Sequence, residues 1–202
     1  MLFRSTTAFE QGVFASLEAV LAAQVEALHV VRHGSPELVR QVRRGKLDAA
    51  LVALPLETSA LSLTRLNRQE PLIAALSAQW AEAEQERLTL STLNGRPLFW
   101  FKRERNPAFF DFTRDIFRRV GYVPACLEEP LEHDVLLARI ARGEGLSLFP
   151  ASFAAIQRQG VVFRAIDETA LCVECGLVML PENAARLAWL LEMAQADSRV
   201  TN

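Results

Sequence analysis

The stretch that decides the fold runs from residue 35 to residue 54 and reads SPELVRQVRRGKLDAALVAL. Its first residues, Ser35 and Pro36, offer an N-cap hydroxyl followed by a proline at the first helical position. Gly45 ends this helix, and residues 47–54 form the continuous apolar run that is typical of a strand covered on both faces. The segment therefore predicts a short helix followed by a buried strand.

The rest of the chain repeats this order of elements. Upstream, Ser5, Thr6 and Thr7 are expected in a loop between an apolar strand at residues 1–4 and a helical stretch around residues 13–21. Further strands are expected at residues 25–31, 97–101, 123–127, 146–149, 161–165 and 171–180, and further helices at 107–120, 132–142 and 183–196. The alternation predicts an α/β fold with a largely parallel sheet and right-handed crossovers.

Two extended stretches, residues 66–77 and 166–180, connect the halves of the chain. They predict two lobes joined by a hinge, with residues 1–69 and 173–202 in subdomain I and residues 70–172 in subdomain II. Ligands of α/β sheets bind beyond the carboxyl ends of the strands, so the expected ligand site lies between the lobes.

The composition excludes several classes of protein. The 202 residues are 50% hydrophobic and 23% charged, with a net charge of −2, which excludes a disordered or fibrous chain. No apolar run is long enough to span a membrane, and the first ten residues lack the layout of a secretory signal, so a cytoplasmic protein is expected. The three cysteines agree with a reducing compartment, and the near-neutral charge argues against DNA binding by this chain alone.

Two glycine motifs carry a resemblance to a known family. Gly45-Lys46-Leu47-Asp48 and the longer run of residues 141–152, with Gly143-Glu144-Gly145 and Pro150, resemble signatures of the effector-binding domain of LysR-type transcriptional regulators. Residues 69–72 and 90–97 match the expected crossover and the lead-in to the second lobe. Residues 105–110, with Glu128 and Glu129, look most like the branch that responds to aromatic acids and ring-cleavage products such as benzoate and muconate.

This resemblance implies an architecture and a set of partners. It implies two Rossmann-like subdomains joined by two crossover strands, as in type 2 periplasmic binding proteins, and a small carboxylate effector. It also implies an N-terminal winged helix-turn-helix, which is absent from this chain, so that DNA is bound only through a domain not present here. Regulatory domains of this kind form side-by-side homodimers, and a tetramer is implied for the full-length protein.

Four hydroxyl residues are candidates for effector binding. Ser5, Thr6 and Thr7 are expected where a strand ends and a helix begins, and the helix N-terminus there would attract a carboxylate. A plain helix cap is the alternative, although capping needs only one hydroxyl. By resemblance, Thr7 aligns best with the hydroxyl that holds the effector. Ser35 repeats this arrangement at the next helix.

Three further candidates come from the resemblance and from charge. Pro107 and Phe109 resemble effector-facing positions at a helix start in the second lobe, where an aromatic ring offers a flat apolar wall. Phe109 is equally compatible with the core. Arg68 could pair with an effector carboxylate, or could be an ordinary surface arginine.

The remaining chemical motifs predict no catalytic residue, metal or cofactor. Cys172 and Cys175 are three apart in an expected strand, so they point to opposite faces and are interpreted as buried thiols. The three histidines lack metal-ligand spacing, and no nucleophile motif or phosphate-binding loop is present in the sequence. The basic residues Lys102, Arg103 and Arg105 are interpreted as solvated surface, with attraction of anions into the cleft as the alternative. The acidic residues Glu128, Glu129, Glu132 and Asp134 are interpreted as a solvated helix entry, with acid/base chemistry as the alternative.

Three classes of function stay open at this point. The leading hypothesis is a ligand-sensing domain that modulates transcription and is not an enzyme. The alternatives are a solute-binding protein of the same fold and an enzyme on a similar two-lobed scaffold.

Overall fold

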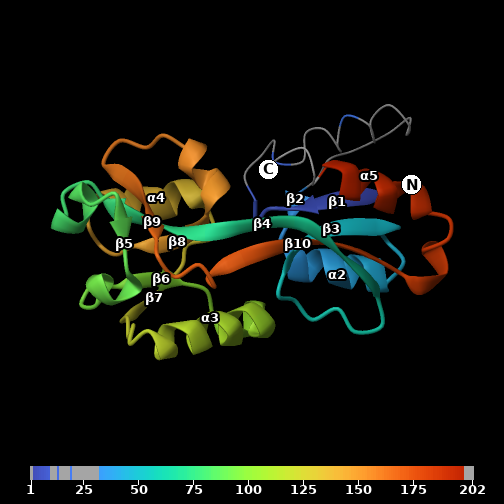
Figure 1. Cartoon of the computed structure of the whole chain (residues 1–202), viewed down its shortest axis with the longest axis horizontal. Coiled ribbons are helices and arrows are strands. Elements are labelled where there is room, and N and C mark those ends of the chain that lie inside the picture. Colours follow the sequence, from blue (N-terminus) through green and yellow to red (C-terminus); the bar gives the residue numbers. More distant parts are fainter. Residues whose placement is uncertain (1, 10–12, 14–18, 20–31, 198–202) are drawn as a thin grey trace. The chain divides into compact units, whose positions relative to one another are not determined.

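The computed structural model describes residues 2–9, 13, 19 and 32–197. The chain divides into two compact units, one of Met1–Gln69 with Val173–Asn202 and one of Glu70–Cys172. Figure 1 shows the elements of both. The strand expected at residues 25–31 and most of the helix expected around residues 13–21 lie outside the described residues.

The sheet of unit 1 is mixed. Its strands are β1 (Phe3–Thr6), β2 (Arg32–His33), β3 (Ala49–Leu54), β10 (Cys172–Met179) and the first part of β4 (Ser62–Ser77), in the order β2-β1-β3-β10-β4. β1 runs parallel to β2 and β3, whereas β10 pairs with β3 in antiparallel register. The largely parallel arrangement expected from the sequence therefore holds for the first three strands, and the returning strand β10 departs from it.

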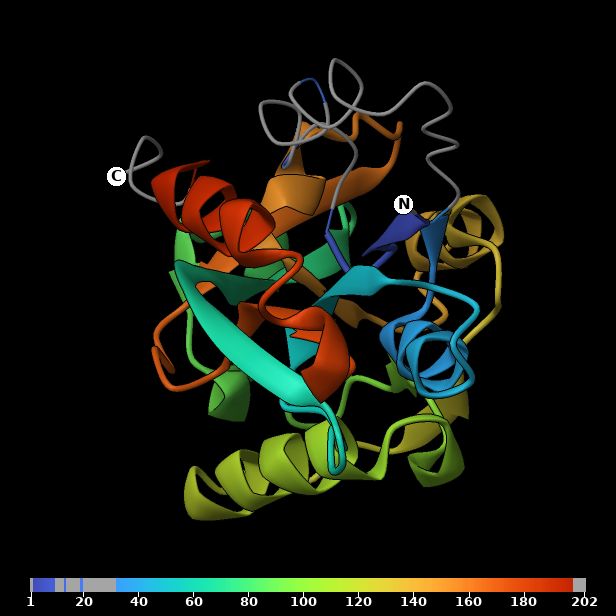
Figure 2. The same ribbon diagram turned by 90° about the vertical axis from the view of Figure 1, so that its right-hand side faces the viewer.

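Helix α2 (Ser35–Arg43) covers one face of this sheet because its apolar residues lie on one side. They pack with buried residues of the segment before β3, of β3 itself and of β10, and the cluster comprises Leu38, Val39, Val42, Leu47, Ala50, Val52, Leu54 and Val178. On the opposite face lies α5 (Ala188–Asp197), visible in Figures 1 and 2. The single helix expected at residues 183–196 is instead a 3₁₀ turn, η5 (Pro181–Asn183), followed by α5.

Unit 2 is built on the second part of β4. There β4 pairs in antiparallel register with β8 (Ser147–Pro150) and β9 (Val161–Ile166), and β5 (Arg87–Leu88) runs parallel to β9. A separate parallel pair joins β6 (Leu98–Trp100) to β7 (Cys126–Glu128). The other elements are α3 (Pro107–Arg119), α4 (His133–Ala141), η1 (Ala81–Glu84), η2 (Leu90–Leu93), η3 (Arg103–Arg105) and η4 (Ala151–Ala155).

The Gly-x-Gly motif has a physical cause in unit 2. Gly143 follows α4 with φ +77°, a left-handed conformation that favours glycine at a helix end. At Gly145 a Cβ atom would lie 2.9 Å from both the Pro97 carbonyl oxygen and the Phe99 ring. The first glycine therefore turns the chain out of α4, and the second lets it pass close to β6. In the part of the chain described, no helix is both long and apolar enough to cross a membrane.

Candidate functional site

Two buried hydroxyls meet at the end of the unit 1 sheet. The Oγ1 atom of Thr6, the last residue of β1, lies 2.7 Å from Oγ of Ser35, the first residue of α2. The backbone N–H of Ala53 in β3 donates to Ser35 Oγ at 2.9 Å, and that of Ala8 donates to Thr6 Oγ1 at 3.1 Å. We call this pair the hydroxyl cluster, defined as Thr6 and Ser35.

The hydroxyl cluster lies where parallel α/β sheets bind ligands. Thr6 ends β1 and Ala53 is next to last in β3, so the cluster is at the carboxyl edge that these two parallel strands share. Ser5 is 2% exposed, Thr6 is fully buried and Ser35 is 5% exposed. Burying hydroxyls costs free energy unless they are hydrogen-bonded, and the mutual bond of Thr6 and Ser35 meets that requirement.

The structure corrects the prediction that Ser5 and Thr6 belong to a loop ahead of a helix. Both residues lie in β1, because β1 begins at Phe3 and pairs with β2 through Ser5 and Thr6. Thr7 follows in a turn, where its side chain is exposed and its N–H donates to the His33 carbonyl at 3.0 Å. Of the three successive hydroxyl residues Ser5, Thr6 and Thr7, Thr7 is therefore the one with an exposed side chain.

The predicted N-cap role of Ser35 is also wrong. Gly34 is the N-cap residue of α2, with extended backbone and no side-chain cap bond, and Ser35 is the first helical residue. The N–H groups of Glu37 and Leu38 are satisfied by the Gly34 carbonyl oxygen. Because the Ser35 hydroxyl is buried against Thr6 and Ala53, it bonds to them rather than to its own helix.

Arg68 belongs to unit 1 and lies within β4. Residues two apart in a strand share a face, so Arg68 is on the same face as the buried Leu66. Its side chain is half-buried. Its role with a ligand stays a prediction.

The aromatic candidates lie in unit 2 at the start of α3. The helix expected from residue 107 begins there, and the Asn106 side chain caps it by accepting the N–H of Phe109 at 3.3 Å. Pro107 is exposed at the first turn. Phe109 is half-buried, and its ring stacks on Phe101 with centroids 5.9 Å apart and an interplanar angle of 17°. Phe109 therefore both packs in an aromatic cluster and presents part of its ring to solvent.

Glu129 is a candidate functional residue that the sequence analysis assigned to the solvated surface. Directly after β7, its N–H donates to the Trp100 carbonyl oxygen at 3.3 Å. Burial raises the pKa of its carboxyl to about 7, although the charge of Arg105 lowers it. The interpretation as solvated surface holds for the exposed Glu128, Glu132 and Asp134 and is wrong for Glu129. Its position at the carboxyl end of a strand is the signal that could have identified it.

The other chemical motifs have structural explanations. Cys175 is buried and Cys172 half-buried in β10, whereas Cys126 is exposed. In the basic loop, Lys102 pairs with Glu128 at 3.0 Å and Arg103 pairs with Asp111 at 2.6 Å. Within the described ranges, no three His, Cys, Asp or Glu side chains gather closely enough to hold a metal ion.

Comparisons with known proteins agree on one family. The family model described as LysR substrate binding domain matches residues 26–199. The transcriptional regulator IlvR of Caulobacter vibrioides is 28% identical over 174 residues, which are 84% of this chain and 57% of that protein. AlsR of Bacillus subtilis is 21% identical over 143 residues, 71% of this chain and 47% of that protein. The chain thus spans about half the length of these curated relatives.

A solved structure shows the same fold. The effector-binding domain of a BenM variant superposes with a TM-score of 0.80 at 18% sequence identity, covering 98% of this chain and 94% of that chain. The two-subdomain fold expected from the sequence, like that of type 2 periplasmic binding proteins, is therefore confirmed, with a mixed sheet.

Proposed function

Because this chain belongs to the LysR substrate-binding domain family, we propose that it senses a small carboxylate effector for a transcriptional regulator. The observation that carries the proposal is the hydroxyl cluster, which joins the ends of β1 and β3 to the start of α2. The N-terminus of a helix carries a partial positive charge, and hydroxyl and N–H donors at such a position suit an anion.

The residues of the cluster would have different tasks. Thr7 is exposed and next to the cluster, so its hydroxyl can donate to a bound carboxylate. Thr6 and Ser35 are buried and bonded to each other, so they hold the end of β1 against the start of α2. Ser5 supports the same strand end. In this proposal, Thr7 contacts the ligand, and the hydroxyl cluster holds Thr7 in position.

An aromatic or muconate-like effector is the finer proposal. It is supported by the stacked Phe101 and Phe109 rings, which give unit 2 a partly open aromatic surface beside the exposed Pro107. Arg68 would add a guanidinium that suits a second carboxylate.

The two rival functions have less support. IlvR and AlsR are both described as transcriptional regulators, which favours a regulator over an exported solute-binding protein. For an enzyme, the buried Ser35 is the hydroxyl in the best-defined environment, but its bonded partners are another hydroxyl and a backbone N–H. Neither partner is a base that could activate a nucleophile.

The partners follow the same proposal. The regulatory domains would pair as homodimers and the full-length protein would form a tetramer. DNA would be bound only through a winged helix-turn-helix outside this sequence. Sedimentation of the chain at micromolar concentration tests the dimer, and a monomer at every concentration would contradict it.

The ligand can be identified by native mass spectrometry of the protein as purified. A retained carboxylate would then be confirmed by calorimetry, together with benzoate, cis,cis-muconate and a neutral, non-aromatic control, the diamide of cis,cis-muconate. The proposal expects binding of at least one carboxylate and no binding of the diamide. Preference for the neutral amide would contradict it.

A further inference from the structure

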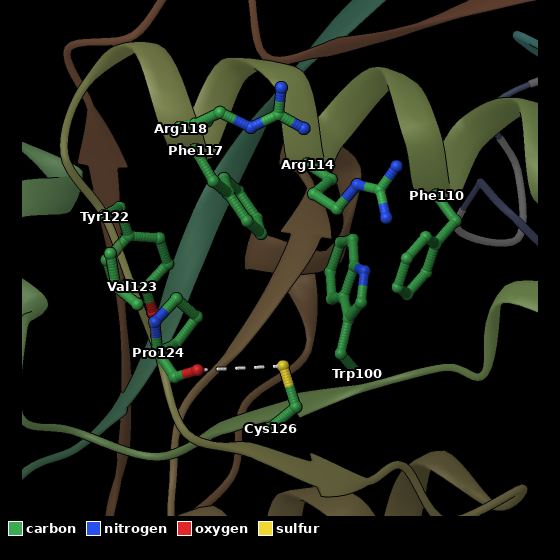
Figure 3. Close-up of a pocket in the computed structure, with 9 residues that line it drawn as sticks. All are labelled: Trp100, Phe110, Arg114, Phe117, Arg118, Tyr122, Val123, Pro124 and Cys126. Carbon is green, nitrogen blue, oxygen red and sulfur yellow. Dashed lines mark hydrogen bonds between the residues drawn. The ribbon is translucent and has the colours of Figure 1, made fainter.

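Helices cover both faces of the parallel strand pair β6–β7 in unit 2. On one face, Figure 3 shows aromatic side chains of α3 pointing toward Trp100 and Cys126 of the strands. On the other face, Phe99 of β6 packs in a buried cluster with residues of α4, and Leu127 of β7 packs against that cluster. With its faces covered, the pair offers a ligand its carboxyl ends, which is where α/β proteins bind ligands.

Phe101 and Glu129 leave the strand pair at these carboxyl ends. Trp100 and Glu128 are the last residues of the two strands and are partners in the parallel register. Directly after them, the Glu129 N–H donates to the Trp100 carbonyl oxygen at 3.3 Å. Pro130 follows, and a residue before proline is held in an extended conformation. The backbone therefore fixes Glu129 beside Phe101, which belongs to the aromatic surface proposed above for the effector.

The Glu129 carboxyl is unpaired but reaches solvent. Its pKa of about 7 has two causes, burial, which raises it, and the charge of Arg105, which lowers it, and no hydrogen bond within the described residues contributes. An enclosed side-chain oxygen without a partner occurs in these residues only at the Tyr122 hydroxyl, so the unpaired Glu129 oxygens are in contact with solvent. A half-buried, unpaired acid at the carboxyl end of a strand suits a ligand-binding group.

One cation acts on the Glu129 carboxyl. It is Arg105, the last residue of η3, whose charge favours the ionised form, although burial outweighs it. On α4, His133 packs edge-on against Phe149 and Phe153, with ring centroids 5.8 Å and 5.1 Å away, and the acids on either side of it are exposed. Further charged groups of the adjoining segments form ion pairs: Lys102 with Glu128 at 3.0 Å, Arg103 with Asp111 at 2.6 Å, Arg114 with Asp111 at 3.2 Å and Arg139 with Glu144 at 2.7 Å.

A bound carboxylate changes the binding of protons at Glu129. Two negative charges close together repel, so an anion beside Glu129 raises the pKa of its carboxyl further. The carboxyl then takes up a proton and becomes an O–H donor. Hydrogen bonds from an acid to a carboxylate are short and strong, so the proton offsets the repulsion and holds the ligand.

We propose that Glu129 recognises the effector as a neutral acid, donating a hydrogen bond to an effector carboxylate, so that binding takes up one proton. This role rests on the proposed function, because it needs a carboxylate effector on the Phe101–Phe109 surface. It makes Glu129 a residue that determines specificity. It also couples the affinity for the effector to pH, since the affinity is highest in acid and falls as the pH rises through neutrality.

Calorimetry with cis,cis-muconate and benzoate between pH 6 and pH 8 tests this role, because both probes stay ionised over this range. For a probe that binds, the affinity is expected to fall about tenfold from pH 6 to pH 8, because the proton that binding requires is scarcer at pH 8. Repeating the titration in buffers of different ionisation enthalpy counts the protons. Uptake approaching one proton is expected at pH 8.

Two variants separate the proton from the side chain. Glu129→Gln imitates the neutral acid, since its amide N–H is a donor that does not titrate. At pH 8 it is expected to bind the probe about tenfold more tightly than the wild type, at pH 6 equally, and without proton uptake. Glu129→Ala lacks the donor and should weaken binding at both pH values. A merely structural role of Glu129 would not produce a gain that is confined to high pH.

Carboxyl ¹³C NMR of glutamate-labelled protein observes Glu129 directly. The resonance that Glu129→Gln removes should titrate with a midpoint of about 7 in the free protein. A saturating probe should raise this midpoint by about one pH unit or more. A midpoint that the bound probe leaves unchanged would overturn the role of Glu129.

The outcomes distinguish this role from the proposed function. If neither probe binds at any pH, the aromatic or muconate-like effector and the role of Glu129 are both wrong. If a probe binds with an affinity independent of pH, or if the pH dependence survives in Glu129→Gln, the role of Glu129 alone is wrong. His133→Gln is the control for a histidine that titrates in the same range. It should keep the wild-type pH dependence, and loss of that dependence would assign the proton to His133 instead.

Discussion

The hydroxyl oxygens of Thr6 and Ser35 lie 2.7 Å apart and are both buried, although 29 positions separate the two residues in the chain. This bond joins the last residue of a strand to the first residue of a helix. Each oxygen also accepts a backbone N–H, from Ala8 and from Ala53. The pair therefore holds three segments of unit 1 at the edge where we place the carboxylate.

Ser35→Ala is expected to lower the free energy of unfolding by about 1–3 kcal/mol, the usual cost of leaving a buried donor unsatisfied. The substitution removes the acceptor of the Ala53 N–H and the partner of Thr6 in one step. Urea unfolding measures the change. Ser91→Ala is the matched control, because Ser91 is exposed and its hydroxyl bonds only to the nearby Thr89 in the contacts seen here. Equal losses for both variants would contradict the role of the buried pair.

The parts of the fold that could be predicted depend on local pattern. The apolar run before and through β3 predicts a strand covered on both faces, and all six residues of Ala49–Leu54 are buried. Asn106 followed by Pro107 predicts the start of α3, because a cap and a proline act within one turn. The Gly-x-Gly motif carries a family likeness in the sequence, but its steric cause depends on β6, which lies beside Gly145 only in the folded chain.

The predictions about the site that were wrong concern residues whose contacts come from distant parts of the chain. Ser35 has the letters of an N-cap, but burial beside Thr6 and Ala53 redirects its hydroxyl. Glu129 stands among exposed acidic residues in the sequence, and only the packing of unit 2 separates it from them. A single sequence contains neither the register of β1 against β3 nor the environment of one carboxyl in a cluster.

Gly145→Ala is expected to destabilise the protein by about 1–3 kcal/mol, the range for adding a methyl group to a packed interior. The new Cβ would lie 2.9 Å from the Pro97 carbonyl oxygen, and a backbone atom cannot move aside as a flexible side chain can. Thermal or urea unfolding measures the loss. At Gly34 the nearest atom to a new Cβ is 4.0 Å away, so Gly34→Ala should cost less. A larger loss for Gly34→Ala would contradict the steric explanation.

Glu129 predicts a pH dependence of stability. Its pKa is about 7 in the folded chain against an ordinary value of 4.5, so the folded state holds the proton more tightly than the unfolded state. Stability from this group is therefore fully present below about pH 4.5 and is lost as the pH rises toward 7. The carboxyls of Glu37, Asp48, Glu82, Asp111 and Glu144 have lowered pKa values and titrate below this range.

Glu129→Gln removes this titration while keeping the side-chain shape. As the pH rises from 5 to 8, the stability of the variant relative to the wild type is expected to increase by about 1–2 kcal/mol. This figure is reduced because the carboxyl is partly exposed to solvent. Urea unfolding at several pH values measures it. Glu128→Gln is the control, because Glu128 is exposed and pairs with Lys102. A wild-type pH profile that Glu129→Gln leaves unchanged would show that this carboxyl is not the group responsible.

Thr7→Val tests the direct contact with the effector, since valine keeps the shape of threonine and removes the hydroxyl. Thr7 is exposed in the turn after β1, and its backbone bond to the His33 carbonyl does not involve the side chain, so the fold should be retained. Affinity for the carboxylate identified by mass spectrometry should fall by about 1–2 kcal/mol, the scale of a hydrogen bond to a charged group. Calorimetry measures it, with the exposed Thr92→Val as the control for a threonine outside the site. If Thr7→Val binds as tightly as Thr92→Val, the ligand is held by other groups near the hydroxyl cluster, and Thr7 has no part in recognising it.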